Sequence, residues 1–158
     1  MVVPALQHEE VELHTLPWQR GGPPMPQIAA ALRARKQRIV EEWRERTLLA
    51  KPQLHQMTDQ QIDAEIGPIL AAMTNAIEVN AEAQWRELGR IAPLQGFHRF
   101  RQHFTLTQLL DEYRILREVA VREVERELNR RTTRTEACSI HDAIDFMIRQ
   151  GTLAMVKE

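Results

Sequence analysis

The sequence predicts an all-α protein, a bundle of about five to six helices that ends in a long C-terminal helix. Apolar side chains recur at spacings of three and four residues, which is the period of a helix buried along one face. Thr58 with Gln61, and Thr105 with Gln108, form the capping-box pattern that begins a helix. No stretch shows the two-residue alternation and β-branched enrichment that are typical of a strand.

The first 26 residues are expected to form a flexible arm, and residues 27–158 the helical domain. Four of the eight prolines fall in residues 17–26, beside Gly21 and Gly22. Proline fixes φ and removes an amide donor, and glycine adds chain entropy, so this stretch should not fold alone. Trp18 could still dock on a neighbouring surface.

Two helices should follow the arm. The first is expected from Gln27 to about Leu49, and its apolar face comprises Ile28, Leu32, Ile39 and Trp43. The second should run from the Thr58 cap to about Val79. We expect a kink or a restart at Pro68, because proline removes one helical hydrogen bond and crowds the preceding turn.

The next helical stretch, residues 81–104, contains Pro93 and is expected to form two short helices. After it, the sequence HFTLTQLLDEYRILREVAVREVERELNRR, residues 103–131, predicts the longest helix of the domain. Its apolar stripe is broad, which indicates contacts on more than one side.

The last helix is expected to begin after the sequence RRTTRTE and to run to the C-terminus. Small and apolar residues follow there in strict three-four alternation, which is the pattern of a coiled-coil seam. The sequence therefore predicts a homodimer whose interface uses Ile140, Ile144, Met147, Gly151 and Ala154. Because the helix ends without a glycine cap, a proline or a polar tail, we expect the natural protein to continue beyond Glu158.

Composition argues against several classes of protein. Lys and Arg total 21 and Asp and Glu total 22, whereas a dedicated nucleic-acid binder shows a basic excess. Cys138 is the single cysteine, so no internal disulfide forms, which fits a reducing compartment. There is no secretory signal and no apolar run approaching the ~18 residues of a membrane helix. We therefore expect a cytoplasmic protein without nucleic-acid or membrane partners.

The reactive side chains do not predict an enzyme. Cys138 and His141 are three residues apart, but a small core thiol beside a surface imidazole is the favoured interpretation. No nucleophile-elbow pattern and no phosphate-binding loop is present. His98 and His103 are five residues apart and so face different sides of a helix, which predicts no metal site. We predict no cofactor, and haem held by one histidine among nearby phenylalanines stays an alternative.

The segment FHRFRQHFTLTQLLDEYRILREVAVREVE, residues 97–125, resembles the N-terminal sensor domain of the RsbR/RsbRD type, the RsbT co-antagonists of stress-signalling assemblies. That domain also occurs at the front of bacterial sensor histidine kinases. The resemblance covers about residues 27 to 157, and His103 stands where the family pattern has a turn glycine. The matching positions are Arg99, Phe104-Thr105-Leu106, Glu112-Tyr113-Arg114, Leu116 and Arg117, with Trp43 in the first helix and HDAIDFMIRQ in the last.

The resemblance implies a globin-like, usually dimeric helical fold without a required haem, and a regulatory role exerted through a following domain. That output domain is a STAS domain in the co-antagonists, and a helical dimerisation and phosphoacceptor domain in the kinases. The straight heptad helix favours the kinase, because two-stranded coils commonly join a sensor to a kinase core.

We therefore expect a non-catalytic sensory and dimerisation domain of a bacterial two-component histidine kinase. The alternatives are a globin-like sensor of haem or a small ligand, and an RsbR-like co-antagonist with a STAS domain.

A cluster of polar residues is the candidate site for a ligand or a structural clasp: Arg99, His103, Tyr113, Arg114 and Arg117. Tyr113 lies on the apolar stripe, so its ring should be buried while its hydroxyl seeks a partner. Arg114 and Arg117 could clasp an acid of the last helix, Asp142 or Asp145, or could instead bind an anionic signal.

Overall fold

The computed structural model describes Trp18 and residues 22–51, 57–102 and 104–157. All regular structure in this part of the chain is helical, as the sequence predicts, and the globin-like arrangement stays a prediction. The helices are α2 (Pro26–Ala34), α3 (Lys36–Ala50), α4 (Asp59–Val79), α5 (Glu82–Arg101), α6 (Leu106–Leu128) and α7 (Arg134–Lys157).

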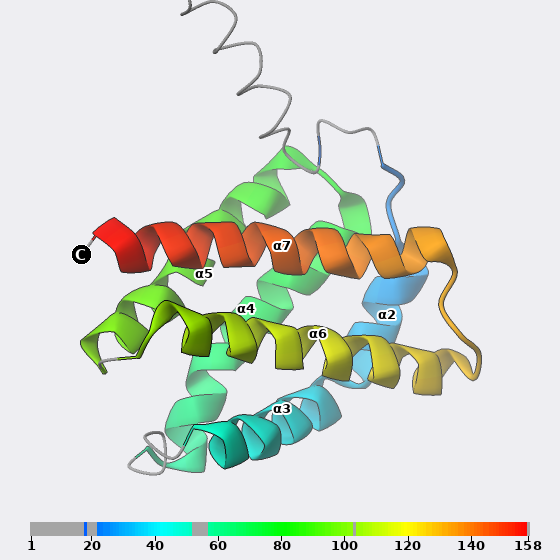
Figure 1. Ribbon diagram of the computed structural model, residues 1–158. Helices are drawn as coiled ribbons and strands as arrows, with labels where there is room; N and C mark the ends of the chain where they lie inside the picture. The colour runs from blue at the N-terminus through cyan, green and yellow to red at the C-terminus, as the bar shows by residue number, and fades with distance from the viewer. Residues whose placement is uncertain (1–17, 19–21, 52–56, 103, 158) are drawn as a thin grey trace, which may run out of the picture.

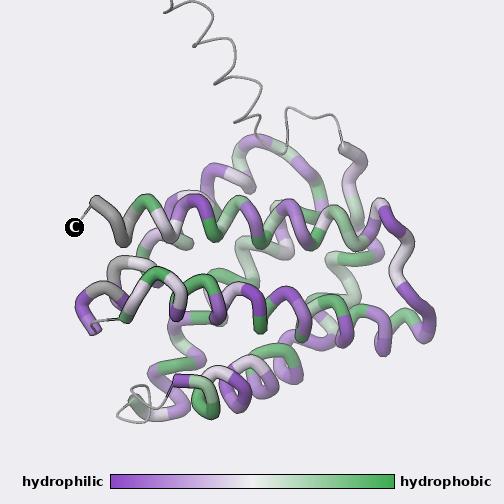
Figure 2. Tube along the Cα trace, viewed as in Figure 1, coloured by the Kyte–Doolittle hydropathy of each residue, from purple (hydrophilic) through white to green (hydrophobic). Residues whose placement is uncertain are grey.

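The helices pack around one core, and α4 crosses behind the antiparallel pair α6 and α7. The long helices α6 and α7 run antiparallel across the front of the molecule, with α3 beneath α6 and α4 crossing behind (Figure 1). α7 packs on α5 and α6, α2 packs on α4 and α6, and α3 packs on α6 and α4. Apolar residues recur along each helix at the helical period and supply one continuous core (Figure 2).

Both predicted capping boxes form. The Thr58 hydroxyl accepts from the Gln61 amide at 3.1 Å and the Gln61 side chain accepts from the Thr58 amide at 2.8 Å. Thr105 and Gln108 pair with the same two distances at the start of α6. These bonds satisfy amides that have no partner within the first helical turn, and so fix where α4 and α6 begin.

A third capping box moves the start of α7. The last helix was predicted to begin after Glu136, which is wrong, because it begins at Arg134. The Thr133 amide donates to the Glu136 carboxylate at 2.8 Å, and the Glu136 amide donates to the Thr133 hydroxyl at 3.2 Å. Arg130 donates to both oxygens of the same carboxylate, at 2.8 and 2.9 Å. This pairing lowers the pKa of Glu136 to about 2.

The predicted first helix is interrupted at Arg35, where φ is −103° and ψ is 8°. The Arg35 guanidinium lies 3.6 Å from Glu123 and 3.8 Å from Glu127, both on α6. The break separates two segments with different neighbours, because α2 packs mainly on α4 whereas α3 packs mainly on α6. A single helix over residues 27–49 is therefore wrong, since one straight rod could not follow both surfaces.

Neither internal proline ends a helix. α4 continues through Pro68 and α5 through Pro93, so a restart at Pro68 and the pair of short helices are both wrong, whereas the alternative of a kink at Pro68 stays a prediction. The residues before the two prolines are Gly67 and Ala92, whose small size reduces the clash with the proline ring. Burial of long apolar faces on α4 and α5 outweighs the loss of one hydrogen bond in each helix.

Part of the predicted N-terminal arm is bound to the domain. The Met25 amide donates to the Ile77 carbonyl at 3.0 Å, and the Gly22 carbonyl accepts from the Asn80 side chain at 2.7 Å. Trp18 packs against the core and is partly buried. The rest of the arm, residues 1–17 and 19–21, lies outside the described residues.

The predicted dimer seam on α7 is buried within the single chain. Ile140, Ile144 and Met147 are each 0% exposed, and Gly151 is also buried. Their contacts are with helices of the same subunit, so these residues cannot form the interface that the sequence predicts. Three-four alternation marks a buried helix face, and here α5 and α6 cover it. The side chain of Ala154 lies outside the described residues.

Two glycines let α5 and α7 cross closely. A Cβ on Gly96 would overlap the backbone carbonyl oxygen of Gly151. A Cβ on Gly151 would lie 2.8 Å from the Tyr113 hydroxyl oxygen. Glycine at both positions therefore brings the two backbones together and leaves room for the Tyr113 ring.

Replacement of Gly96 by alanine should destabilise the fold. The new methyl group meets backbone rather than a flexible side chain, so we expect a loss of about 1–3 kcal/mol in the free energy of unfolding. Gly67→Ala is the matched control, because a Cβ on Gly67 meets nothing beyond its chain neighbours within 4 Å, and α5 already carries alanine before a proline, at Ala92. Urea titration followed by circular dichroism measures both. Equal stability of the two variants would show that the α5–α7 crossing is not tight.

The Glu136 cap should make the stability of the fold depend on pH. A carboxyl whose pKa falls from 4.5 to about 2 on folding stabilises the fold above pH 4.5, and this contribution is lost as the pH falls towards 2. We expect Glu136→Gln to lower Tm by a few degrees at pH 7. The difference from the original protein should shrink between pH 4.5 and 2.

The control for that titration is Thr133→Ala, which removes the other half of the cap. This variant should lower the free energy of unfolding by about 1 kcal/mol, largely independently of pH, since a hydroxyl does not titrate. A Tm difference for Glu136→Gln that stays constant down to pH 2 would contradict the assignment.

Candidate functional site

A buried ion pair joins α5 to α6. The side chains of Arg99 and Glu112 are both 0% exposed, and the Arg99 Nε lies 2.9 and 3.0 Å from the two carboxylate oxygens of Glu112. A second carboxylate comes from α4, because Glu65 Oε2 lies 2.7 Å from Arg99 Nη2. Three helices therefore contribute charge to one point in the core, where unpaired ions would be strongly unfavourable.

Two neutral side chains, Gln95 and Gln102, complete this group. We call the five residues the Arg99 cluster: Glu65, Gln95, Arg99, Gln102 and Glu112. Gln95 Nε2 donates to Glu112 at 3.2 Å, and Arg99 Nη1 donates to Gln102 at 2.9 Å. The Arg99 guanidinium also lies over the Phe104 ring, 5.4 Å from its centre. The backbone carbonyl of Glu112 accepts from the Trp43 indole at 3.1 Å, which adds α3 to the same centre.

Burial and charge shift the titration of this cluster. Burial raises the pKa of Glu112 above its ordinary value, and the Arg99 charge offsets this only in part. Burial alone would lower the pKa of Arg99, but the Glu112 and Glu65 carboxylates raise it, so the guanidinium stays charged. Burial, and then the Glu112 charge, raise the pKa of Tyr113, which therefore stays a neutral phenol.

The predicted site residues do not form one group. Arg99 is at the centre of the cluster, and Tyr113 is buried beside it with its hydroxyl unpartnered. Arg117 reaches α7 and donates to Asp145 at 2.7 Å, one of the two acids expected for the clasp. Arg114 is exposed and lies 3.6 Å from Asp111 on its own helix, so it takes no part in that clasp. His103 lies outside the described residues.

Sequence reasoning missed the acids of the cluster. Glu112 lies on the apolar stripe of α6, three residues after Leu109 and four before Leu116, and an acid at such a position is a usable signal of a buried pair. Glu65 gives no comparable signal, because its partner Arg99 is distant in sequence and no local spacing relates them.

A groove of about 280 Å³ lies between α4 and α5, beside the cluster. Its polar end has Glu65, Gln95 and His98, and its apolar wall consists of Ala64, Pro68, Ile69, Ile91 and Leu94. We call it the α4–α5 groove. Pockets for drug-sized ligands measure about 300–1,000 Å³, so this groove would not hold a porphyrin beside His98 without rearrangement.

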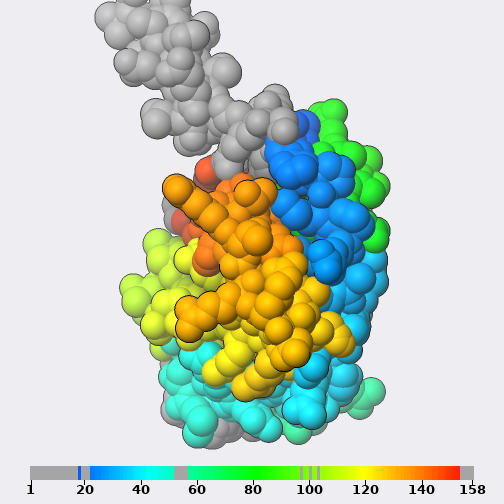
Figure 3. All heavy atoms as spheres, turned by 90° about the vertical axis from the view of Figure 1, so that its right-hand side faces the viewer, coloured from blue at the N-terminus to red at the C-terminus, as the bar shows by residue number. Residues whose placement is uncertain are grey.

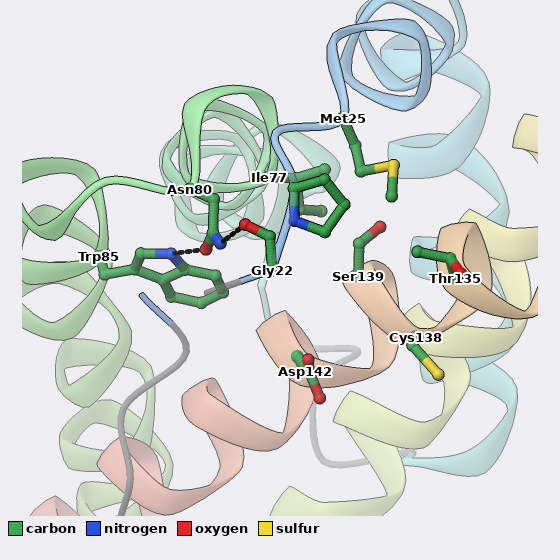
Figure 4. Close-up of a pocket in the computed structure, with 10 residues that line it drawn as sticks. Gly22, Met25, Ile77, Asn80, Trp85, Thr135, Cys138, Ser139 and Asp142 are labelled. Carbon is green, nitrogen blue, oxygen red and sulfur yellow. Dashed lines mark hydrogen bonds between the residues drawn. The ribbon is translucent and has the colours of Figure 1, made fainter. Parts of the chain in front are cut away.

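A second cavity, the N-terminal pocket, has a volume of about 160 Å³ and lies between residues 22–25, the α4–α5 corner and the first turns of α7 (Figure 4). Asn80 builds the corner: its φ of 49° ends α4, its Nδ2 donates to Gly22, and its Oδ1 accepts from the Trp85 indole at 2.9 Å. The α7 side is lined by Thr135, Cys138, Ser139 and Asp142, and the opposite side by the apolar Met25 and Ile77.

The surroundings of this pocket are visible from the side of the molecule. Figure 3 shows the face on which the start of α7, the end of α6 and α2 reach the surface together. Cys138 is exposed there and forms no disulfide, so the interpretation of this thiol as a core residue is wrong.

Comparison with protein-family models, curated proteins and solved structures finds no match to this chain. In the described part of the chain, no three or more His, Cys, Asp or Glu residues are grouped so as to hold a metal ion. None of the helices searched there is long and apolar enough to span a membrane.

Proposed function

We propose that this chain is a non-catalytic sensory domain of a bacterial signalling protein, in which the N-terminal pocket binds a small apolar ligand and α7 transmits the change. The observation that carries the proposal is the position of the pocket. It has one wall on α7 and the other on residues 22–25 and the α4–α5 corner, so a ligand there contacts elements that are distant in sequence.

The pocket fits a molecule of about one ring. A cavity of roughly 150 Å³ lined by apolar groups holds benzene, and the N-terminal pocket has about 160 Å³. Met25, Ile77 and Trp85 supply apolar contact surface. Ser139 and Asp142 on α7 supply acceptor oxygens for one hydrogen-bond donor of the ligand. The ligand class is therefore a small aromatic or branched aliphatic molecule with a single donor group.

α7 is suited to respond because separate contacts hold its two halves. The N-terminal half carries the capping box at Thr133 and the wall of the pocket. The C-terminal half crosses α5 at Gly96 and Gly151. A ligand that enters the pocket presses on the first half, and the close crossing acts as the pivot for a small rotation of the helix.

The downstream part of the proposal rests on the resemblance to RsbR-type sensor domains. It comprises cytoplasmic location, homodimerisation and an output domain, for which we favour a histidine kinase over a STAS domain. The buried face of α7 is excluded as the dimer interface, so a dimer would use surface outside Ile140, Ile144 and Met147.

The single cysteine gives a direct test of the pocket. Cys138 is exposed and lines the pocket, so a bound ligand should slow its reaction with a disulfide reagent such as 5,5′-dithiobis(2-nitrobenzoate). We expect phenol, benzyl alcohol or indole to slow the reaction and to change Trp85 emission. Ser139→Leu, which fills the pocket, should abolish both effects, whereas Ser139→Ala keeps the space and the Asp142 acceptor and should retain them.

Hydrogen exchange separates sensing from simple binding. A probe that slows the reaction of Cys138 should also change amide exchange along α7 beyond the residues it touches. Two results would overturn the proposal: a panel of such probes that never slows the Cys138 reaction, or a bound probe that leaves exchange in α7 unchanged.

A further inference from the structure

We propose that the α4–α5 groove is a second binding site, which takes a small organic cation: an ammonium group attached to an aryl or branched alkyl body. This inference is independent of the N-terminal pocket, with which the groove shares no lining residue. Three observations on the described residues carry it.

The first observation is a buried acceptor without a donor. Gln95 is 3% exposed and lines the groove, and its Oε1 has no hydrogen-bond partner. Its Nε2 is occupied by Glu112 at 3.2 Å, so the amide is oriented with the oxygen away from that carboxylate. A buried acceptor left unpaired is unfavourable, and a ligand N–H at this end of the groove would relieve it.

The second observation is the charge at the same end. Glu65 lines the groove with its side chain 14% exposed. Behind it, the two carboxylates of Glu65 and Glu112 face one guanidinium, that of Arg99. His98 lies at the rim, 52% exposed, with Nδ1 3.9 Å from Glu65 Oε1. A cationic donor is therefore favoured over an anion at this end.

The third observation is the proline within α4. Pro68 has no N–H, so the carbonyl of Ala64 lacks the donor that a helix normally supplies four residues later. Ala64 and Pro68 both line the groove. The groove thus has a carboxylate and a side-chain amide oxygen at its polar end, and Pro68 leaves one further acceptor on the α4 turn that lines it. An ammonium group has three donors and no acceptor, which matches this set.

The apolar wall determines which kind of body the ammonium group of the ligand should carry. Ile69, Ile91 and Leu94, with the proline ring, form a surface that suits a hydrocarbon body. The volume of about 280 Å³ is roughly twice that of a cavity that holds benzene. A ring with a two-carbon chain to the ammonium group is of the right size, and phenethylammonium is the probe we would use.

Isothermal titration calorimetry on the whole chain at low ionic strength tests whether the groove prefers a positively charged ligand. We expect phenethylammonium to bind, 2-phenylethanol to bind on the order of tenfold more weakly, and 3-phenylpropionate not to bind, since the three share a ring and differ in the polar group. Equal binding of the ammonium and the carboxylate would overturn the assignment of a cation site. Absence of binding by all three would overturn the site itself.

Variants at an exposed position test whether the cation binds in the α4–α5 groove, and they do not disturb the core. Leu94 lines the groove and is 52% exposed, so Leu94→Lys adds a positive charge there and should weaken phenethylammonium on the order of tenfold. Leu94→Glu should retain or tighten binding, which separates charge from lost apolar contact. Leu110→Lys on α6, at a leucine that does not line the groove, should bind like the original protein. Equal binding by the two lysine variants would show that the cation binds elsewhere.

Discussion

The buried pair of Arg99 and Glu112 is the constraint on which the packing of this domain depends. Two ions with no exposed side-chain surface are tolerated only when each satisfies the other, so α5 and α6 must meet in one register. Glu65 extends the requirement to α4, and the Glu112 carbonyl binds Trp43 of α3.

α7 stands outside this network and is held by contacts of a different kind. It crosses α5 at two glycines, packs on α6 through apolar side chains, and pairs with α6 through Arg117 and Asp145. The Arg99 cluster thus joins α3–α6, whereas α7 lies outside it and forms one wall of the N-terminal pocket, which is the arrangement that the proposed sensory role uses.

The sequence predicts the helices better than their partners. Capping residues such as Thr58 and Thr105 satisfy amides within four residues of themselves, so their effect can be read locally. The face containing Ile144 was predicted to be a dimer interface, but it is buried within the subunit, because periodicity does not say whether α5 or a second subunit covers an apolar face. The break at Arg35 and the continuous helix through Pro93 both follow from tertiary packing that overrides local preference. The sequence predicted only part of the Arg99 cluster, since Arg99 was a candidate site residue and Glu65 was not.

A double-mutant cycle on Arg99 and Glu112 tests the central claim most directly. Arg99→Met and Glu112→Leu should each lower the free energy of unfolding by about 3–5 kcal/mol. The first leaves the buried Glu112 carboxylate without its cation, and the second leaves the buried Arg99 guanidinium with only the partly exposed Glu65. The double variant should lose less than the sum by at least about 2 kcal/mol, since the partly exposed Glu65 can turn to water. Additive effects within about 0.5 kcal/mol, or single losses below about 1 kcal/mol, would contradict the account.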